Sequence, residues 1–250
     1  MAKIKIYALD FDGVICDSAI ETGITGWKVA SELWPDMPSA PPSDILEKFR
    51  QVRPVMETGY EAILIMRKLF EGIEPRVLLE QFNLQIKTII RRDEIDIDGL
   101  KRRFGDMRDK WILDDLEQWI LMNPLFIGLA DKLRKINPQN VYIITTKQER
   151  FVSQILKVNN IVFPYKHIYG LDRNLSKQQV LADLLRLHYQ QDILFVEDRL
   201  PTLLNAISDD RLSEVQLFFA DWGYNSEQDK ATAKQQASIT TINLDEMLLL

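Results

Sequence analysis

The sequence contains few cysteines and histidines and no long apolar run. Its single cysteine, Cys16, cannot form an internal disulfide, which is typical of a protein kept in a reducing compartment. No apolar stretch approaches the roughly 18 residues of a membrane-spanning helix. The N-terminus also lacks the charged, apolar and small-residue pattern of a secretion signal. We therefore expect a cytoplasmic protein with no membrane partner.

Dense positive charge is missing as well. The 250 residues contain 31 Lys and Arg against 37 Asp and Glu, which gives a formal net charge of -6. The two most basic patches, residues 89–93 and 101–103, alternate with acidic and apolar residues at helical spacing, as on the solvated face of a helix. The charge pattern predicts no nucleic-acid partner.

Short apolar runs of the buried-strand type recur along the chain, and helical patterns separate most of them. This alternation favours an α/β fold with a Rossmann-like, three-layer core, in which helices cover both faces of a mostly parallel sheet. The strand runs are residues 4–9, 141–145, 192–196, 215–220 and 238–242.

The interval after the first strand is different, because residues 16–121 are almost wholly helical in pattern. An insertion of about one hundred residues is too long for a single crossover and long enough for a small helical bundle. The sequence therefore predicts a discontinuous core, residues 1–15 and 122–250, with an inserted all-α domain over residues 16–121.

Polar residues follow three of the predicted strands at the points where those strands end. In a parallel sheet these ends lie at one edge, where open α/β sheets bind their ligands. Clustered carboxylates repel each other unless a cation neutralises them, and a set of oxygen ligands favours Mg²⁺. Lys177, near the start of a predicted helix, would add positive charge. The strand-end residues are Asp10, Asp12, Thr145, Thr146, Glu197 and Asp198.

Four motifs in a fixed order resemble those of the haloacid dehalogenase superfamily. DFDGV (10–14) is similar to its first motif, YIITT (142–146) to the second, Lys177 to the lysine of the third, and FVEDR (195–199) to the acidic fourth. The position of the helical insertion resembles the family's helical cap of the C1 type. The sequence departs from the pattern at Thr146, where the family commonly has Asn.

The resemblance implies a hydrolase that acts through an aspartyl-phosphate. Asp10 would be the nucleophile and Asp12 the general acid and base, while Lys177, Thr145 and Thr146 would bind phosphate. The resemblance also implies that Mg²⁺ is held by Asp10, the carbonyl of Asp12 and Asp198, with Glu197 as a further ligand candidate. Because an acid at position 12 serves to protonate an alcohol, a halide substrate is disfavoured.

The leading hypothesis is thus a magnesium-dependent phosphatase of a small phosphorylated metabolite. A sugar phosphomutase of the same superfamily is the nearest alternative, because the Glu197–Asp198 form of the fourth motif resembles that of such mutases. A non-catalytic binding or regulatory protein with the same fold is the third. Arg50, Arg53 and Tyr60 of the insertion are candidates for substrate contact, although a surface role is the simpler interpretation. The sequence predicts neither the substrate nor the oligomeric state.

Overall fold

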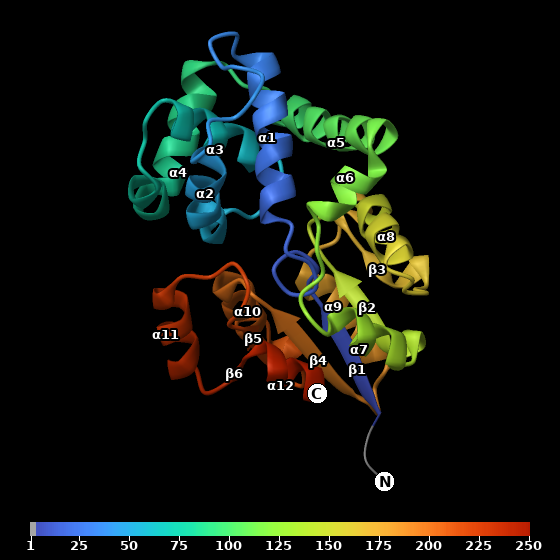
Figure 1. The fold of residues 1–250 in the computed structure, drawn as a ribbon. Coiled ribbons are helices and arrows are strands. Elements are labelled where there is room, and N and C mark those ends of the chain that lie inside the picture. The colour runs from blue at the N-terminus through green and yellow to red at the C-terminus, as the bar shows by residue number, and fades with distance from the viewer. Residues whose placement is uncertain (1–3) are drawn as a thin grey trace. The chain divides into compact units, whose positions relative to one another are not determined.

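The computed structural model describes residues 4–250 and divides into two compact units (Figure 1). The first unit contains the residues up to Asp17 and those from Leu125 onward, and the second contains Ser18–Pro124. The predicted boundaries lie two to three residues away from these. Cys16 forms an antiparallel bridge with Leu125, and the Phe126 amide donates to the Ile15 carbonyl at 3.0 Å, which holds these segments with the first unit.

The first unit is built on one parallel sheet, which confirms the predicted fold class. The described strands have the order β3-β2-β1-β4-β5-β6, and each neighbouring pair is parallel. Their bounds are β1 Lys5–Leu9, β2 Val141–Ile144, β3 Ile168–Tyr169, β4 Asp192–Glu197, β5 Gln216–Ala220 and β6 Ile239–Ile242. The sequence reasoning missed β3, because a two-residue strand is too short to produce an apolar pattern.

Helices cover both faces of this sheet. Ile6, Ala8 and Phe195 pack on one face with α9, α10 and α11, while Tyr7, on the opposite face, reaches the end of α12 next to α7. Both faces are therefore buried, which explains why the strand runs are continuously apolar. The helices of this unit are α7 Leu129–Lys135, α8 Glu149–Val158, α9 Lys177–Leu187, α10 Leu200–Ile207, α11 Glu227–Gln235 and α12 Leu244–Leu249, with 3₁₀ turns at Pro138–Asn140, Tyr165–His167, Leu171–Arg173 and Asp210–Leu212.

The second unit is entirely helical in its regular structure and has its own core. Trp27, Phe49 and Ile63 are fully buried there. Helices α1 and α3 approach closely at Gly26, where an added Cβ would lie 2.7 Å from the backbone of Ala62. The helices are α1 Ala19–Leu33, α2 Ile45–Val52, α3 Glu61–Phe70, α4 Pro75–Arg92, α5 Ile97–Asp114 and α6 Leu116–Leu121, with a 3₁₀ turn at Arg53–Val55.

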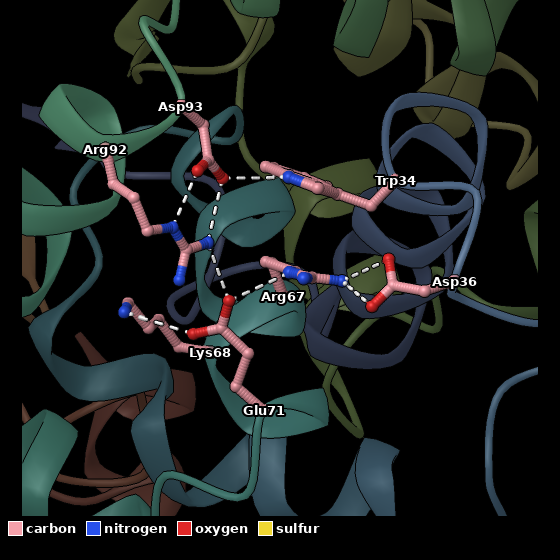
Figure 2. A network of polar contacts seen from close by, with 7 residues as sticks. All are labelled: Trp34, Asp36, Arg67, Lys68, Glu71, Arg92 and Asp93. Atoms are coloured by element: carbon pink, nitrogen blue, oxygen red, sulfur yellow. Dashed lines mark hydrogen bonds and ion pairs between the residues drawn. The ribbon is translucent and has the colours of Figure 1, made fainter.

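A network of polar side chains joins the ends of α1, α3 and α4 in this second unit (Figure 2). Glu71 lies at its centre, where it accepts from Arg67 at 2.9 Å, Lys68 at 3.2 Å and Arg92 at 2.7 Å. We refer to the seven residues as the helical-unit network: Trp34, Asp36, Arg67, Lys68, Glu71, Arg92 and Asp93.

Among residues 4–250, no helix combines the length and the apolar character that a membrane crossing requires.

Candidate active site

The carboxyl ends of two adjacent strands, β1 and β4, bring the predicted acidic residues together. β1 lies between β2 and β4, and its next residue, Asp10, continues the ladder by donating its amide to the Val196 carbonyl at 3.0 Å. Glu197 is the last residue of β4, and Asp198 follows it. Asp10, Glu197 and Asp198 offer ligand oxygens that all lie within 4.8 Å of one another. The expected convergence at the edge of the sheet is therefore present.

Lys177 links two of these carboxylates. Its ammonium donates to Asp10 Oδ1 and to Glu197 Oε2, both at 2.7 Å. The lysine is the first residue of α9, and a capping box between Ser176 and Gln179 determines where that helix begins. Burial alone would lower the pKa of Lys177, but the two carboxylates raise it above its usual range. The two carboxylates therefore favour the charged form of the lysine.

The three clustered carboxylates are almost completely buried. Asp10 is 6% exposed, Glu197 0% and Asp198 1%. Burial raises the pKa of Asp10 to about 7, with Lys177 opposing the shift and Glu197 adding to it. Desolvation disfavours the charged form of Asp10, so additional positive charge at this cluster would favour the ionised carboxylate.

Asp12 pairs with a second lysine, Lys147, that the sequence reasoning did not select. Lys147 Nζ lies 3.0 Å from Asp12 Oδ1, and the lysine side chain is completely buried. The Lys147 backbone amide donates to Thr145 Oγ1 at 3.1 Å. Because that contact uses the oxygen of Thr145 as an acceptor, its hydroxyl hydrogen remains available for another acceptor. Thr146 lies between them in the same loop.

Glu197 has a donor on each carboxylate oxygen. Oε2 accepts from Lys177, and Oε1 accepts from the Arg199 backbone amide at 3.1 Å. These contacts fix the carboxylate of Glu197 beside Lys177 and near the carboxylates of Asp10 and Asp198. It therefore belongs to the cluster both as a ligand candidate and as an anchor of Lys177.

Asp198 is held by two loops that pack closely around it. Gly13 has a φ of +88°, and an added Cβ there would lie 2.1 Å from Asp198 Oδ2. Glycine is thus required both by the backbone conformation and by the space. On the other side, the Tyr224 amide donates to Asp198 Oδ2 at 2.6 Å. The sequence does not reveal this contact, because a backbone amide that contacts an acid leaves no signal in the side-chain pattern.

The composition of this cluster fits Mg²⁺. Four carboxylates face two lysines, so the group carries an excess of negative charge in the absence of a cation. All the available donors are oxygens, which hard divalent cations prefer. We call the group the carboxylate site: Asp10, Asp12, Lys147, Lys177, Glu197 and Asp198.

The three candidates from the insertion and the two histidines have the following places in the fold. Arg50 is in α2, Arg53 is buried in the following 3₁₀ turn and donates to the Met56 carbonyl at 3.3 Å, and Tyr60 precedes α3. His167 is buried and stacks on Tyr142, whose hydroxyl lies 2.9 Å from His188 Nε2. These contacts support a packing role for both histidines.

Comparison with known proteins identifies the fold. No protein-family model matches the sequence, and no curated protein has a significantly similar sequence. A predicted phosphatase from Clostridium acetobutylicum has a similar structure, with a TM-score of 0.59 and 14% identity over 100% of this chain and 98% of that one. A predicted phosphoglycolate phosphatase from Haemophilus somnus 129PT has a TM-score of 0.57 and 16% identity over 92% of each chain.

A conserved haloacid dehalogenase-like protein from Agrobacterium tumefaciens is also similar, with a TM-score of 0.53 and 14% identity over 96% of this chain and 93% of that one. The chain therefore has the α/β fold of the haloacid dehalogenase-like proteins, as its four motifs predicted. At these identities the likeness establishes the fold, and the activity has to be argued from the carboxylate site itself.

Proposed function

We propose that this protein is a magnesium-dependent phosphatase that hydrolyses the phosphomonoester of a small metabolite through an aspartyl-phosphate on Asp10. The observation that carries the proposal is the paired arrangement of acids and lysines. Lys177 contacts Asp10, while a different lysine, Lys147, contacts Asp12. Two carboxylates one residue apart are thus kept in two different environments, as expected where two neighbouring acids have different tasks.

Asp10 would be the nucleophile. One of its carboxylate oxygens forms a bond to phosphorus while the bond from phosphorus to the alcohol oxygen breaks. Lys177 orients that carboxylate through its 2.7 Å contact with Oδ1. The Thr145 hydroxyl would donate to a phosphoryl oxygen, since its own oxygen is already used as an acceptor by the Lys147 amide.

Asp12 would move the protons. In the first half of the reaction its carboxyl group donates a proton to the leaving alcohol. In the second half the resulting carboxylate takes a proton from the water whose oxygen attacks phosphorus, so that inorganic phosphate leaves and Asp10 is regenerated. Lys147 would orient Asp12 for both steps through its 3.0 Å contact.

The residues that would hold Mg²⁺ are Asp10, Asp198 and the carbonyl of Asp12, with Glu197 as a further candidate. The chemistry that the bound ion supplies is positive charge, which keeps Asp10 ionised and stabilises the transferring phosphoryl group. The carboxylate site consists of acids and lysines, which suit a metal ion and a phosphoryl group and not the remainder of a metabolite. We therefore assign the choice of substrate to the helical unit, with Arg50, Arg53 and Tyr60 as the first residues to test.

The test is phosphate release from a panel of phosphorylated metabolites with and without Mg²⁺. We expect the wild type to hydrolyse at least one compound only with the metal. Asp10→Asn should lose more than about a thousandfold in kcat, because the nucleophile is removed. The matched control is Asp245→Asn, which changes an exposed aspartate of the same unit and should leave the rate unchanged.

Two outcomes would contradict the proposal. Turnover that depends on a bisphosphate and releases no free phosphate would favour the phosphomutase. Wild-type protein that is inactive on every compound and binds no Mg²⁺ would favour a non-catalytic protein with the same fold.

A further inference from the structure

One residue outside the predicted motifs, Tyr224, contacts two separate parts of the first unit. It lies in the loop between β5 and α11 and is 8% exposed. Its backbone amide donates to Asp198 Oδ2 at 2.6 Å. Its side-chain hydroxyl donates to Asp17 Oδ1 at 2.9 Å. A proposed metal ligand is thus joined, through a single residue, to the last residue before the chain enters the helical unit.

The rest of the loop has little freedom to shift. The Trp222 indole donates to the Val14 carbonyl at 3.2 Å, and Asn225 Nδ2 donates to the carbonyls of Ala220 at 2.8 Å and Asp198 at 3.3 Å. An added Cβ at Gly223 would lie 2.3 Å from Asp198 Cβ and 2.5 Å from the Gly13 carbonyl oxygen. A displacement of residues 222–225 would therefore displace Asp198 as well.

The segment that Tyr224 reaches through its hydroxyl, residues 11–17, also has a well-defined conformation. Residues 11–16 form a tight turn, in which the Gly13 amide donates to the Cys16 carbonyl and the Cys16 amide to the Phe11 carbonyl, both at 2.9 Å. Asp17 follows this turn directly. Its hydrogen bond with Tyr224 therefore anchors the end of the turn to the loop that holds Asp198.

We propose that Tyr224 is a positioning residue that couples metal binding at Asp198 to the conformation of residues 13–17. This inference rests on the proposed function, since it takes Asp198 as a metal ligand. Groups that hydrogen-bond to metal ligands orient them and increase metal affinity. Because coupling between two sites is reciprocal, metal bound at Asp198 also stabilises residues 13–17.

The first experiment is a calorimetric titration of the whole protein with Mg²⁺ in the absence of substrate. Tyr224→Phe removes the hydroxyl and leaves the ring and the backbone amide, and we expect it to weaken Mg²⁺ binding about tenfold. The matched control is Tyr142→Phe, which removes a hydroxyl bonded to His188 at 2.9 Å in the same unit. It should bind Mg²⁺ as the wild type does.

The second experiment tests the coupling itself. Hydrogen exchange of the backbone amides in residues 13–17 should slow when Mg²⁺ binds to the wild type, and it should slow less in Tyr224→Phe. Asp17→Asn keeps an acceptor oxygen but removes the charge, so its effect should be smaller than that of Asp17→Ala. In the double variant of Tyr224→Phe with Asp17→Ala, the loss of affinity should be less than the sum of the single losses.

The outcomes separate this inference from the proposed function. If the wild type binds Mg²⁺ and Tyr224→Phe binds it equally well, the coupling is wrong and the phosphatase proposal stands. Additive losses in the double variant, or exchange in residues 13–17 that Mg²⁺ does not change, would also overturn the coupling. If the wild type binds no Mg²⁺ at millimolar concentrations, both proposals fail.

Discussion

The carboxylate site and the helical-unit network both contain acids and basic residues, but in different proportions. In the network, three acids face three basic residues (Figure 2). The side chains of Asp36 and Arg92 are 60% and 44% exposed. In the carboxylate site, four acids face two lysines, and Asp10, Glu197 and Asp198 are buried. The network is balanced without any ligand, whereas the site is not.

The pKa directions follow this difference. In the network, hydrogen bonds from Arg67 lower the pKa of Asp36 and those from Arg92 lower the pKa of Asp93. In the carboxylate site, burial raises the pKa of Asp10 to about 7. Acids whose charge is already stabilised by neighbouring cations are typical of a structural role. A buried acid whose charge is poorly stabilised is typical of a site that binds a cation.

The ion pair of Arg108 and Glu21 extends this comparison. It is buried, as the carboxylate site is, and its charges are balanced, as those of the network are. Arg108 donates to both carboxylate oxygens of Glu21, at 2.8 and 2.6 Å, and Glu21 is fully buried. Thr25 and Trp119 donate to the same carboxylate. If charge balance marks a structural role, this pair contributes to stability.

Arg108→Met should therefore destabilise the helical unit by about 3–5 kcal/mol, because it leaves the carboxylate of Glu21 buried without its cation. Urea unfolding followed by tryptophan fluorescence measures the loss. The control is Arg76→Met, whose pair with Glu80 is exposed and should therefore contribute little to stability. A loss below about 1 kcal/mol at Arg108 would contradict the comparison.

The second prediction concerns pH and uses the raised pKa of Asp10. The folded protein binds this proton more tightly than the unfolded chain, where the pKa is near 3.8. The free energy of unfolding of the metal-free protein should therefore fall as pH rises from about 4 to about 7. Asp10→Asn has no carboxyl group at this position, so it cannot take up or release this proton. It should be more stable than the wild type at pH 8, by on the order of 2–4 kcal/mol, and similar to it at pH 4.

Urea unfolding in the presence of EDTA at several pH values measures this difference. Mg²⁺ should restore the stability of the wild type at pH 8, because it replaces the missing positive charge. Parallel pH profiles for the wild type and Asp10→Asn would show that the site is not electrostatically strained.

Much of the carboxylate site could be predicted from the sequence, because the parallel sheet determines it. Once the apolar runs are interpreted as strands of one parallel sheet, Asp10, Thr145 and Asp198 are expected at one edge. Lys177 could be placed near them because a helix start is visible in the sequence. The strand order itself and the short strand β3 were not predictable in this way.

The remaining contacts depend on features that a linear pattern does not contain. Lys147 contacts Asp12 across 135 positions of sequence, so only the folded chain pairs them. Tyr224 acts on Asp198 through its backbone amide, which every residue except proline has. The network was missed for a similar reason, since Arg92 lies in a basic patch interpreted as a solvated helix face. Its partner Glu71 is 21 positions away.

The smallest effect is expected in the helical-unit network, and its sign should be opposite to that at Asp10. Glu71→Gln removes the shared partner of Arg67, Lys68 and Arg92 and should lower the free energy of unfolding by about 1–2 kcal/mol. The loss should shrink at about 1 M salt, because the outer part of the network is exposed. Asp36→Asn, which changes the most exposed acid, should have a smaller effect than Glu71→Gln, because solvent screens its pair with Arg67. Urea unfolding at low and high salt measures both variants. If Glu71→Gln instead stabilised the protein as we expect of Asp10→Asn, charge balance would not distinguish the structural cluster from the functional one.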